Sequence, residues 1–514
     1  MTTWEALKTV SFSYMRRGLS AVKLMATNSL GQSSGYEAAA QNRRLSLWRG
    51  TQEHINQLLS QTGRTMNARA RHLTRNSAYA VKGKRSFVGN AVGTGIEPMS
   101  KVQDRKLRSQ INDLFLRWTD EADADGLTDF YGLQTMVAGS MFEVGECFAR
   151  LRPRRVSDGL SVPLQIQLLE SEQLPLDHYE TLPNGNQIRA GIEFNLIGKR
   201  VAYHFLKEHP GDRPLFNFNS HMTVRVPAGN VLHMYEPLRP GQIRGQTQLA
   251  AAMVKTFLLD IYDDAELDRK KTAALFAGFV RRPADMEGTL TENEADDRGV
   301  SVAELSPGTM NVLLDGEEVD FSEPADVGGN YEAFQRRTLL AVAAAMGVPY
   351  ENVTGDLRNV SYSSLRAGVL EFRRCLEQWQ HQVMVYQFCR PVWRRWMDTG
   401  VLSGAMDLPG FFDNPEPLYL VGWIPVRWEW VDPLKDRQGQ RLALELGVKS
   451  RSQAVREEGG DIETLDQEIA QDRAREKELG LSFPRGGGQP NGVLAVEEDE
   501  SGGVGGTVMS EDAP

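Results

Sequence analysis

The feature that most constrains the fold is a long amphipathic pattern over residues 362–398. Ser363 or Ser364 can cap the start of a helix there, and Pro391 is the first residue that interrupts it. We predict one helix of about 36 residues with a kink at the proline. Its apolar residues recur at steps of three and four, which places them on one helix face: Leu365, Val369, Phe372, Leu376, Trp379, Val383 and Tyr386.

Charge is spread unevenly along the chain. The formal net charge is −10 over 514 residues, yet residues 43–108 hold 14 Lys or Arg against three acids. This basic segment includes a helical pattern over residues 43–80, which suits either nucleic acid or an acidic neighbouring subunit. Residues 109–514 are acidic in sum, so we do not expect the body of the protein to adhere to DNA.

The length and the apolar runs limit the class of protein. A chain of 514 residues exceeds one core, so we expect two or more domains or one elongated protomer. The best apolar run, residues 339–348, is about half of the roughly 18 residues that a membrane span needs, so we expect no membrane partner. We see no secretion signal, and the odd number of widely spaced cysteines (Cys147, Cys375 and Cys389) is typical of reduced thiols.

Helical and strand patterns follow one another in blocks. Residues 101–118 and 127–142 are helical patterns, whereas residues 81–98 have strand and turn character. Residues 144–231 alternate short strands with turns and contain a hairpin signal at Asn184-Gly185. We therefore predict a β-rich region in the first half of the chain.

A second long helical pattern begins near Thr247 and runs to residue 280. Asp260, Asp264, Asp268 and Lys271 share one face of this helix. The solvated side of a monomer explains such a face.

The motifs of common enzymes are absent from the sequence. There is no G-x-x-x-x-G-K-S/T, G-x-S-x-G, H-E-x-x-H or C-x-x-C motif, so we predict no catalytic residues, no metal site and no cofactor. The histidines of the β-rich region lack ligand spacing and are expected to be structural. A two-metal site assembled from distant carboxylates remains open.

Several strings of this sequence resemble one family. GVPYENVTGDLRNVSYSSLRAG (347–368) is similar to the signature of the lambda-type portal proteins of tailed phages, in which a GVPYE turn, a GD-containing loop and a YSS-x-RAG helix start follow in that order. Ser361 stands where the family usually has Asn, which keeps a side chain able to cap the helix. GECFARLRP, RVPAGNVLHMYEPLRPGQIRG and WVDPLKD also resemble the family, so the resemblance covers residues 65–480.

The resemblance implies an α+β portal fold with long stem and wing helices, a β-rich wing, a small α/β clip and a helical crown. On this reading the regions are a flexible arm (1–42), the wing (43–245), a stem helix (246–280), the clip (281–329), a second stem helix (330–347), a tunnel loop (348–361), the kinked wing helix with a strand (362–431), the crown helices (432–480) and a disordered acidic tail (481–514).

The family also implies a function. Portal proteins of this family form a dodecameric ring at one capsid vertex, and double-stranded DNA enters and leaves the head through this ring. The resemblance therefore implies as partners the terminase large subunit, capsid and scaffold proteins and head-completion proteins. The virion, and the host cytoplasm during assembly, would be its locations. The resemblance assigns the narrowest point of the channel to a loop of seven residues: Gly355, Asp356, Leu357, Arg358, Asn359, Val360 and Ser361.

Two roles for the loop and two other functions remain open. Arg358 either touches phosphates transiently or pairs with Asp356 between subunits, and the acids of the second long helix are candidates to face the channel. The alternatives to a portal are a nucleic-acid enzyme of the packaging machinery and a minor head or scaffold-binding protein without a channel.

Overall fold

The computed structural model describes residues 43, 46–47, 50–212, 222–274, 278–281, 318–321, 330–358, 360–425, 433–458, 460 and 462–481. The expected arm (1–42), most of the expected clip (281–329) and nearly all of the expected tail (481–514) lie outside these residues. The chain divides into two compact units, residues 1–95 with 102–420 and residues 96–101 with 421–514. Among the described helices, none has the length and hydropathy to cross a bilayer.

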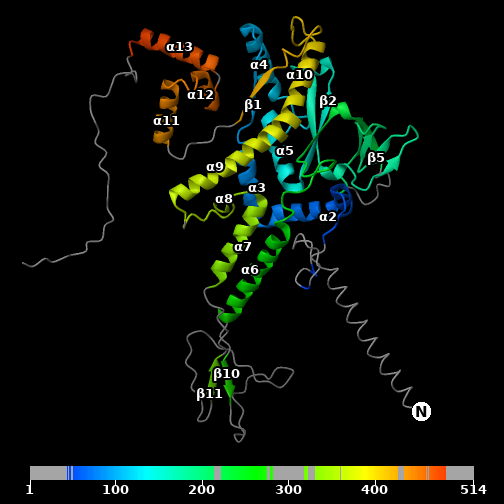
Figure 1. Cartoon of the computed structure of the whole chain (residues 1–514), viewed down its shortest axis with the longest axis vertical. Helices are drawn as coiled ribbons and strands as arrows, with labels where there is room; N and C mark the ends of the chain where they lie inside the picture. Colours follow the sequence, from blue (N-terminus) through cyan, green and yellow to red (C-terminus); the bar gives the residue numbers. More distant parts are fainter. Residues whose placement is uncertain are drawn as a thin grey trace, which may run out of the picture. The chain divides into compact units, whose positions relative to one another are not determined.

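Among the described residues, the first unit begins with the helices α2 (Ile55–Asn76), α3 (Ala78–Ala91), α4 (Arg105–Thr119) and α5 (Phe130–Val144) (Figure 1). The strand and turn character predicted for residues 81–98 is wrong over most of that range, because α3 continues to Ala91. Ala80, Gly83 and Phe87 form the buried face of α3, and a Cβ on Gly83 would lie 3.1 Å from the Met346 sulfur. The glycine therefore serves close helix packing and not a turn.

Two antiparallel sheets confirm the predicted β-rich region. The strand orders are β3-β2-β9 and β4-β5-β6-β7-β8. The first sheet contains β2 (Glu146–Pro153), β3 (Leu164–Leu169) and β9 (Val231–Tyr235). The second contains β4 (Glu180–Thr181), β5 (Gln187–Arg189), β6 (Ile192–Phe194), β7 (Arg200–Leu206) and β8 (Thr223–Pro227).

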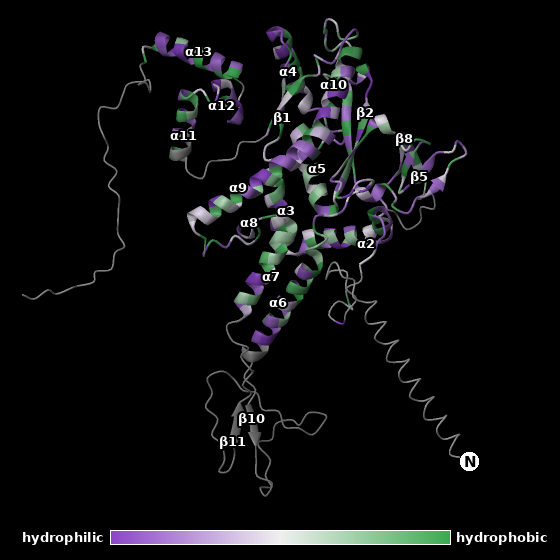
Figure 2. Ribbon diagram, in the orientation of Figure 1, coloured by the Kyte–Doolittle hydropathy of each residue, from purple (hydrophilic) through white to green (hydrophobic). Residues whose placement is uncertain are grey.

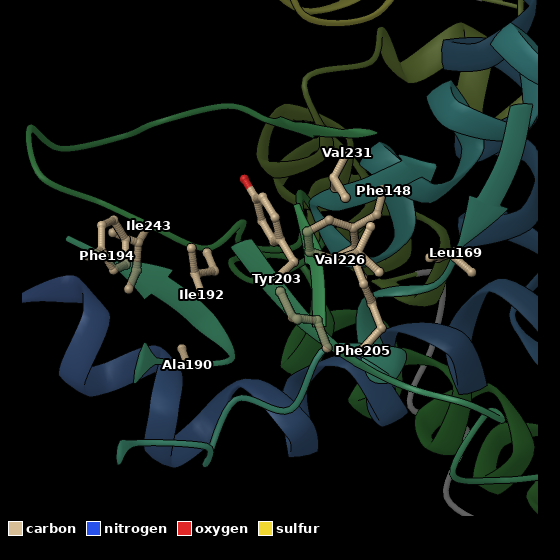
Figure 3. Packing of buried hydrophobic residues seen from close by; sticks show 11 residues of the cluster. Phe148, Leu169, Ala190, Ile192, Phe194, Tyr203, Phe205, Val226, Val231 and Ile243 are labelled. Atoms are coloured by element: carbon tan, nitrogen blue, oxygen red, sulfur yellow. The ribbon is translucent and has the colours of Figure 1, made fainter. Parts of the chain in front are cut away.

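Both sheets contribute to one apolar core. Phe148 of β2 and Val231 of β9 pack with Tyr203 and Phe205 of β7 and with Val226 of β8 (Figure 3). The ring centroids of Phe148 and Phe205 are 5.3 Å apart in an edge-to-face arrangement, which aromatic pairs favour. The hairpin predicted at Asn184-Gly185 joins β4 to β5, and Gly185 has the positive φ of 82° that such a turn requires.

The predicted long helix is continuous, but a π-helical segment before Pro391 is found in place of the predicted kink at the proline. It consists of α9 (Tyr362–Trp379), the π-helical segment η6 (Gln380–Cys389) and α10 (Arg390–Leu402). The wider π turns precede Pro391, whose missing N–H cannot support the α-helical ladder there. Because these turns also shift the helical period, Tyr386 leaves the predicted apolar face and is 63% exposed.

The start of the helix is also corrected. Neither Ser363 nor Ser364 is the cap; the Ser361 hydroxyl accepts the Ser364 backbone N–H at 3.2 Å. Further along, Gln380 is buried and donates to the Ala91 carbonyl at 2.8 Å, and Trp393 and Trp396 join the aromatic core around Phe115. The helix is thus anchored to α3 and α4 by its second half.

A buried ion pair connects the β-rich region to the segment that leads into α6. Arg244, which is 1% exposed, donates from Nε and Nη2 to the Glu146 carboxylate at 2.6–3.0 Å. The same carboxylate accepts the Gly245 backbone N–H at 2.7 Å and lies 3.2 Å from His233 Nε2. Gly145 permits this approach, since a Cβ there would lie 2.0 Å from the Gln246 carbonyl oxygen.

The helices α6 (Met253–Ala274) and α7 (Asn330–Met346) pack against each other (Figure 1). The predicted start of α6 near Thr247 is six residues too early, because residues 248–252 form turns and α6 begins at Met253. Strand β10 (Gly278–Arg281) pairs antiparallel with β11 (Glu318–Phe321), which lies in the stretch expected to be the clip. The predicted end of the helix at residue 280 is wrong, because α6 ends at Ala274 and residues 278–280 belong to β10. The short helix α8 (Tyr350–Thr354) follows Gly347, whose φ is 68°.

The second unit contains the strand pair β1 (Glu97–Ser100) and β12 (Val421–Ile424) and three helices, α11 (Pro433–Glu445), α12 (Arg451–Glu457) and α13 (Ile462–Leu479). Pro433 is the first residue of α11, a position that suits its missing backbone N–H. The Ser450 hydroxyl caps α12 by accepting the Gln453 backbone N–H at 3.1 Å.

Candidate channel-lining site

The loop of residues 355–361 is defined by local hydrogen bonds. Gly355 ends α8 in the left-handed region, with a φ of 77°. The Asp356 carboxylate then accepts the Arg358 backbone N–H at 3.2 Å, and Ser361 caps the next helix. The backbone conformation is therefore encoded by a glycine and two short polar side chains. Asn359 lies outside the described residues.

Arg358 is engaged by two carboxylates of its own chain. Its Nε and Nη2 donate to Asp356 at 2.9 and 3.0 Å, a bidentate contact. Its Nη2 also lies 3.1 Å from a carboxylate oxygen of Glu332, in the first turn of α7. The Asp356–Arg358 pair, considered between subunits in the sequence analysis, forms here within one chain. One guanidinium thus joins the loop to α7.

These contacts change the acidity of the loop groups. The hydrogen bonds from Arg358 lower the pKa of the Asp356 carboxyl to about 2. The Asp356 and Glu332 carboxylates raise the pKa of Arg358, which stays charged. Two acids and one guanidinium leave this cluster with one net negative charge at neutral pH. Leu357, at 59% exposed, is the apolar side chain that the loop presents to solvent.

The four candidates on α6 divide into two groups. Asp264, Asp268 and Lys271 are exposed, and Lys271 Nζ lies 3.1 Å from Asp268. Asp260 is half-buried, and burial, with the nearby carboxylates of Asp263 and Asp264, raises its pKa. Asp264, Asp268 and Lys271 thus reach solvent, whereas Asp260 is partly covered.

Sequence reasoning missed the acid that holds the two helices together. Asp263 accepts the Tyr331 hydroxyl at 2.8 Å and the Gln335 side-chain amide at 3.2 Å. Burial, together with this contact, raises the pKa of Tyr331 to about 12. Asp263 lies one residue from the predicted face, and Glu332 of the loop cluster is 24 positions before Asp356. Periodicity does not reveal either partnership, because both depend on how α6, α7 and the loop pack.

Apolar side chains remain exposed on α6 and α7, where green and purple residues intermingle in Figure 2. The exposed members on α6 are Val254, Phe257, Leu258, Ile261 and Leu267, and those on α7 are Phe334 and Leu340. A monomer gains nothing from solvating a row of large apolar groups, so this surface is typical of a protein interface.

One cluster has the donor atoms of a metal site. Ligand atoms of Glu170, Glu172 and His209 lie within 4.8 Å of one another. Arg71, however, donates bidentately to Glu172 at 2.7 and 2.8 Å and lies 3.2 Å from Glu170. The two carboxylates are therefore already neutralised in part by a guanidinium, which disfavours a cation there.

Comparison with known proteins gives consistent matches. The family model described as "Phage portal protein, lambda family" matches residues 41–380. The "Probable portal protein" of Halomonas phage phiHAP-1 is 28% identical over 489 residues, which cover 90% of this chain and 91% of the relative. "Portal protein B" of Escherichia phage lambda is 20% identical over 504 residues, covering 89% and 92%.

Solved structures also match over most of the chain, at low similarity. One is titled "Neck of native GTA particle computed with C12 symmetry", where GTA denotes a gene transfer agent. It is 13% identical with a TM-score of 0.44, covering 81% of this chain and 94% of that one. A portal protein of the HK97 phage family from Corynebacterium diphtheriae is 14% identical with a TM-score of 0.29, covering 59% and 84%. At these scores the likeness carries no argument of its own.

Proposed function

Since the chain belongs to the lambda family of phage portal proteins, we propose that it forms a closed dodecameric ring at one capsid vertex and that DNA passes through this ring. The observation that carries the proposal is the family match over residues 41–380, which includes the loop and both packed helices. The ring would reside in the virion after assembly in the host cytoplasm. Its proposed partners are the terminase large subunit, capsid and scaffold proteins and head-completion proteins.

The exposed apolar row on α6 and α7 supports a ring. A head-to-tail contact between identical subunits closes when its rotation divides the circle, and each subunit then covers its neighbour's exposed surface. Phe257 and Ile261 lie one turn apart on α6 and are each about half exposed. Covering such side chains removes apolar area from water, which drives association.

The charge of the site supports passage of DNA without adhesion. The loop cluster of Asp356, Arg358 and Glu332 has one net negative charge, and Asp264 and Asp268 add acids on α6. A channel that neutralised many phosphates would bind DNA tightly through counterion release. We therefore propose Gly355–Ser361 as the tunnel loop, with Asp264, Asp268 and Lys271 as channel-facing residues, and no catalytic activity in this chain.

Electron microscopy with mass photometry tests the ring. We expect closed rings with a central hole from the unmodified protein and monomers from the double variant Phe257→Glu/Ile261→Glu. A matched control, Leu196→Glu/Ile197→Glu, alters two apolar residues that are more than 80% exposed in the turn between β6 and β7, and it should still form rings. Compact monomers that consume ATP or cut DNA would contradict the proposal.

Deleting residues 356–360 tests the loop separately. Rings should still form, because the apolar row on α6 and α7 is retained, whereas packaging or retention of DNA should be impaired. Unchanged phage titre and genome length would show that the loop contributes to neither packaging nor retention of DNA.

A further inference from the structure

The helices α11, α12 and α13 of the second unit have no apolar core of their own. None of the described residues between 433 and 481 is buried. Several large apolar residues of this stretch are exposed instead: Leu434, Leu442, Leu444, Leu446, Val448, Leu479 and Leu481. A helical segment of about 50 residues rarely buries enough apolar surface to offset the entropy of ordering it. These helices therefore need an apolar partner.

The packing among the three helices is also incomplete. An open cavity of about 520 Å³ lies between them, and each helix contributes an apolar residue to its lining, namely Leu444, Val455 and Leu465. The interior of a folded domain is close-packed. A cavity of this size at the centre of such a small group of helices is a second sign that the unit is unfinished.

Two apolar patches of these helices lie outside the cavity. Leu444 of α11 lines the cavity, whereas Leu442 and Leu446 are each two positions away and therefore about 200° around the helix. Leu446 is 68% exposed. The α11 patch, Leu442 with Leu446, thus points away from α12.

The second patch is at the end of α13. This helix has 18 residues, about 27 Å, but α12 has only seven, about 10 Å. Leu479 lies on nearly the same face as Leu465, about four turns later. Leu465 lines the cavity, whereas Leu479 is 63% exposed, because α13 outruns the short α12. The α13 patch, Leu479 with Leu481, is left without cover.

The charges of this unit are divided between the same two helices. Residues 433–456 contain six Lys or Arg against two acids, and residues 457–478 contain nine acids against three Lys or Arg. Some of these charges pair inside the unit, such as Arg451 with Asp466 at 2.6 Å. In the described part of the chain, ion pairs include none of the α13 residues Glu468, Glu476 and Glu478. The unit therefore has a basic half and an acidic half, with an apolar patch on each.

This division selects a second copy of the chain as the partner. Duplex DNA would be repelled by the acidic half and would leave both apolar patches in water. Two copies placed head to tail bring the basic half of one against the acidic half of the other, and they bury the two patches together. A ring supplies such a neighbour to every copy.

We propose that the α13 patch of one copy packs on the α11 patch of the next, so that neighbouring copies complete each other's helical unit. The inference rests on the proposed ring only in that identical copies lie side by side. It concerns a surface that the family match over residues 41–380 does not include.

Cysteine crosslinking of the full-length protein tests the contact. Cys375→Ser first removes the exposed native cysteine, which leaves two buried ones. Leu446→Cys and Leu479→Cys are then made in separate chains, co-expressed, and treated with a short bismaleimide. We expect crosslinked dimers from the mixture and their loss when either variant is alone. The matched control, Ala474→Cys on another face of α13, should not crosslink to Leu446→Cys. Crosslinking of Leu446→Cys to itself would indicate a two-fold contact and overturn the proposal.

Hydrogen exchange provides a second test that needs no cysteine variant. The amides of α11 and α13 should exchange at least roughly tenfold more slowly in the assembled protein than in the monomeric Phe257→Glu/Ile261→Glu variant, because helices without a partner open easily. The buried helix α5 should exchange equally in both. Rings that show neither crosslinking nor protection would overturn this inference and leave the portal proposal standing. Crosslinking between copies that form no rings would do the reverse.

Discussion

Two arginines of this protein make nearly the same bonds in opposite surroundings. Arg244 and Arg358 each donate bidentately to a carboxylate, of Glu146 and Asp356 respectively. The side chain of Arg244 is 1% exposed, whereas that of Arg358 is 70% exposed. The first pair connects the β-rich region to the start of α6, and the second connects a loop to α7.

Burial decides what each pair does. In the interior both charges are shielded from water, and removing one partner leaves the other charge buried and unpaired. Near the surface, water and salt replace a lost partner, so the pair contributes little to folding. The comparison teaches that the first pair specifies structure, while the second sets the charge and position of a loop that we propose meets DNA.

The largest expected effect comes from Arg244→Met. Glu146 would remain buried beside His233 without its guanidinium, and the carbonyls of Leu174 and Ala190 would lose their donor. We expect the free energy of unfolding to fall by about 3–5 kcal/mol, measured by urea denaturation. The double variant Glu146→Gln/Arg244→Met should be less damaged, because no buried charge is left. Arg394→Met, which breaks an exposed pair, is the control. An equal loss of stability in this variant would show that burial does not set the cost of losing an arginine.

The next effect is a pH dependence from the same cluster. Burial lowers the pKa of His233 to about 4, from an ordinary value near 6.5. The unfolded chain therefore binds a proton at His233 between these values and the folded chain does not. Stability from this group is complete above pH 6.5 and is lost as the pH falls toward 4, by about 3 kcal/mol.

Denaturation at a series of pH values checks this. His233→Gln should flatten the decline between pH 6.5 and 4, although it lowers stability overall, whereas His381→Gln at an exposed position of η6 should leave the decline unchanged. The Glu146 carboxyl, whose pKa the Arg244 charge depresses despite burial, adds a further loss only below its ordinary value near 4.5. A decline that persists in His233→Gln would assign it to another group.

A smaller effect is expected where η6 meets β9. The Gln387 side chain accepts the Tyr235 backbone N–H at 2.9 Å and donates to its carbonyl at 3.0 Å. Gln387→Met keeps the volume and removes both bonds, which should cost roughly 1–3 kcal/mol in urea denaturation. Gln382→Met, on the exposed side of η6, should cost nothing measurable.

The elements that the sequence predicts well are those whose signal is local. The hairpin at Asn184-Gly185 and the helices on either side of the β-rich region each follow from neighbouring residues. Residues 81–98 were mispredicted, because α3 continues to Ala91 and packs Gly83 on its buried face, where a Cβ would lie 3.1 Å from the sulfur of the distant Met346. The bonds that Gln380 and Gln387 of η6 form with α3 and β9 join residues far apart in the sequence, which periodicity cannot express.

The candidate site also has one part with a local sequence signal and one part that depends on tertiary packing. Gly355, Asp356 and Ser361 shape the loop through local bonds, and their residue types are sufficient to predict a turn and a helix start. The sequence does not predict that Glu332 belongs to the cluster. Its contact with Arg358 joins residues 26 positions apart and requires the chain to fold back between α7 and the loop after α8. The membership of such a site is set by tertiary structure, even when its conformation is set locally.

The smallest effect on stability, and the one that decides the role of the loop, is expected from Arg358→Ala. Because Arg358 is exposed, rings and melting temperature should be unchanged. The variant leaves Asp356 and Glu332 unpaired, so each subunit would present two negative charges in place of one. DNA packaging in vitro should then decline through repulsion of phosphates, and added salt should relieve the defect by screening.

The alternative role gives the opposite salt dependence. If Arg358 touched phosphates directly, salt would weaken the remaining contacts and deepen the defect. Arg358→Lys separates the roles further, since a lysine keeps the charge but cannot bridge Asp356 and Glu332 with one planar fork. If Arg358→Lys packages DNA fully and added salt deepens the packaging defect of Arg358→Ala, Arg358 contacts phosphates. Arg337→Ala, which removes one exposed charge from α7 outside the cluster, should package normally in either case, so a defect there would trace the effect to overall charge and not to the loop.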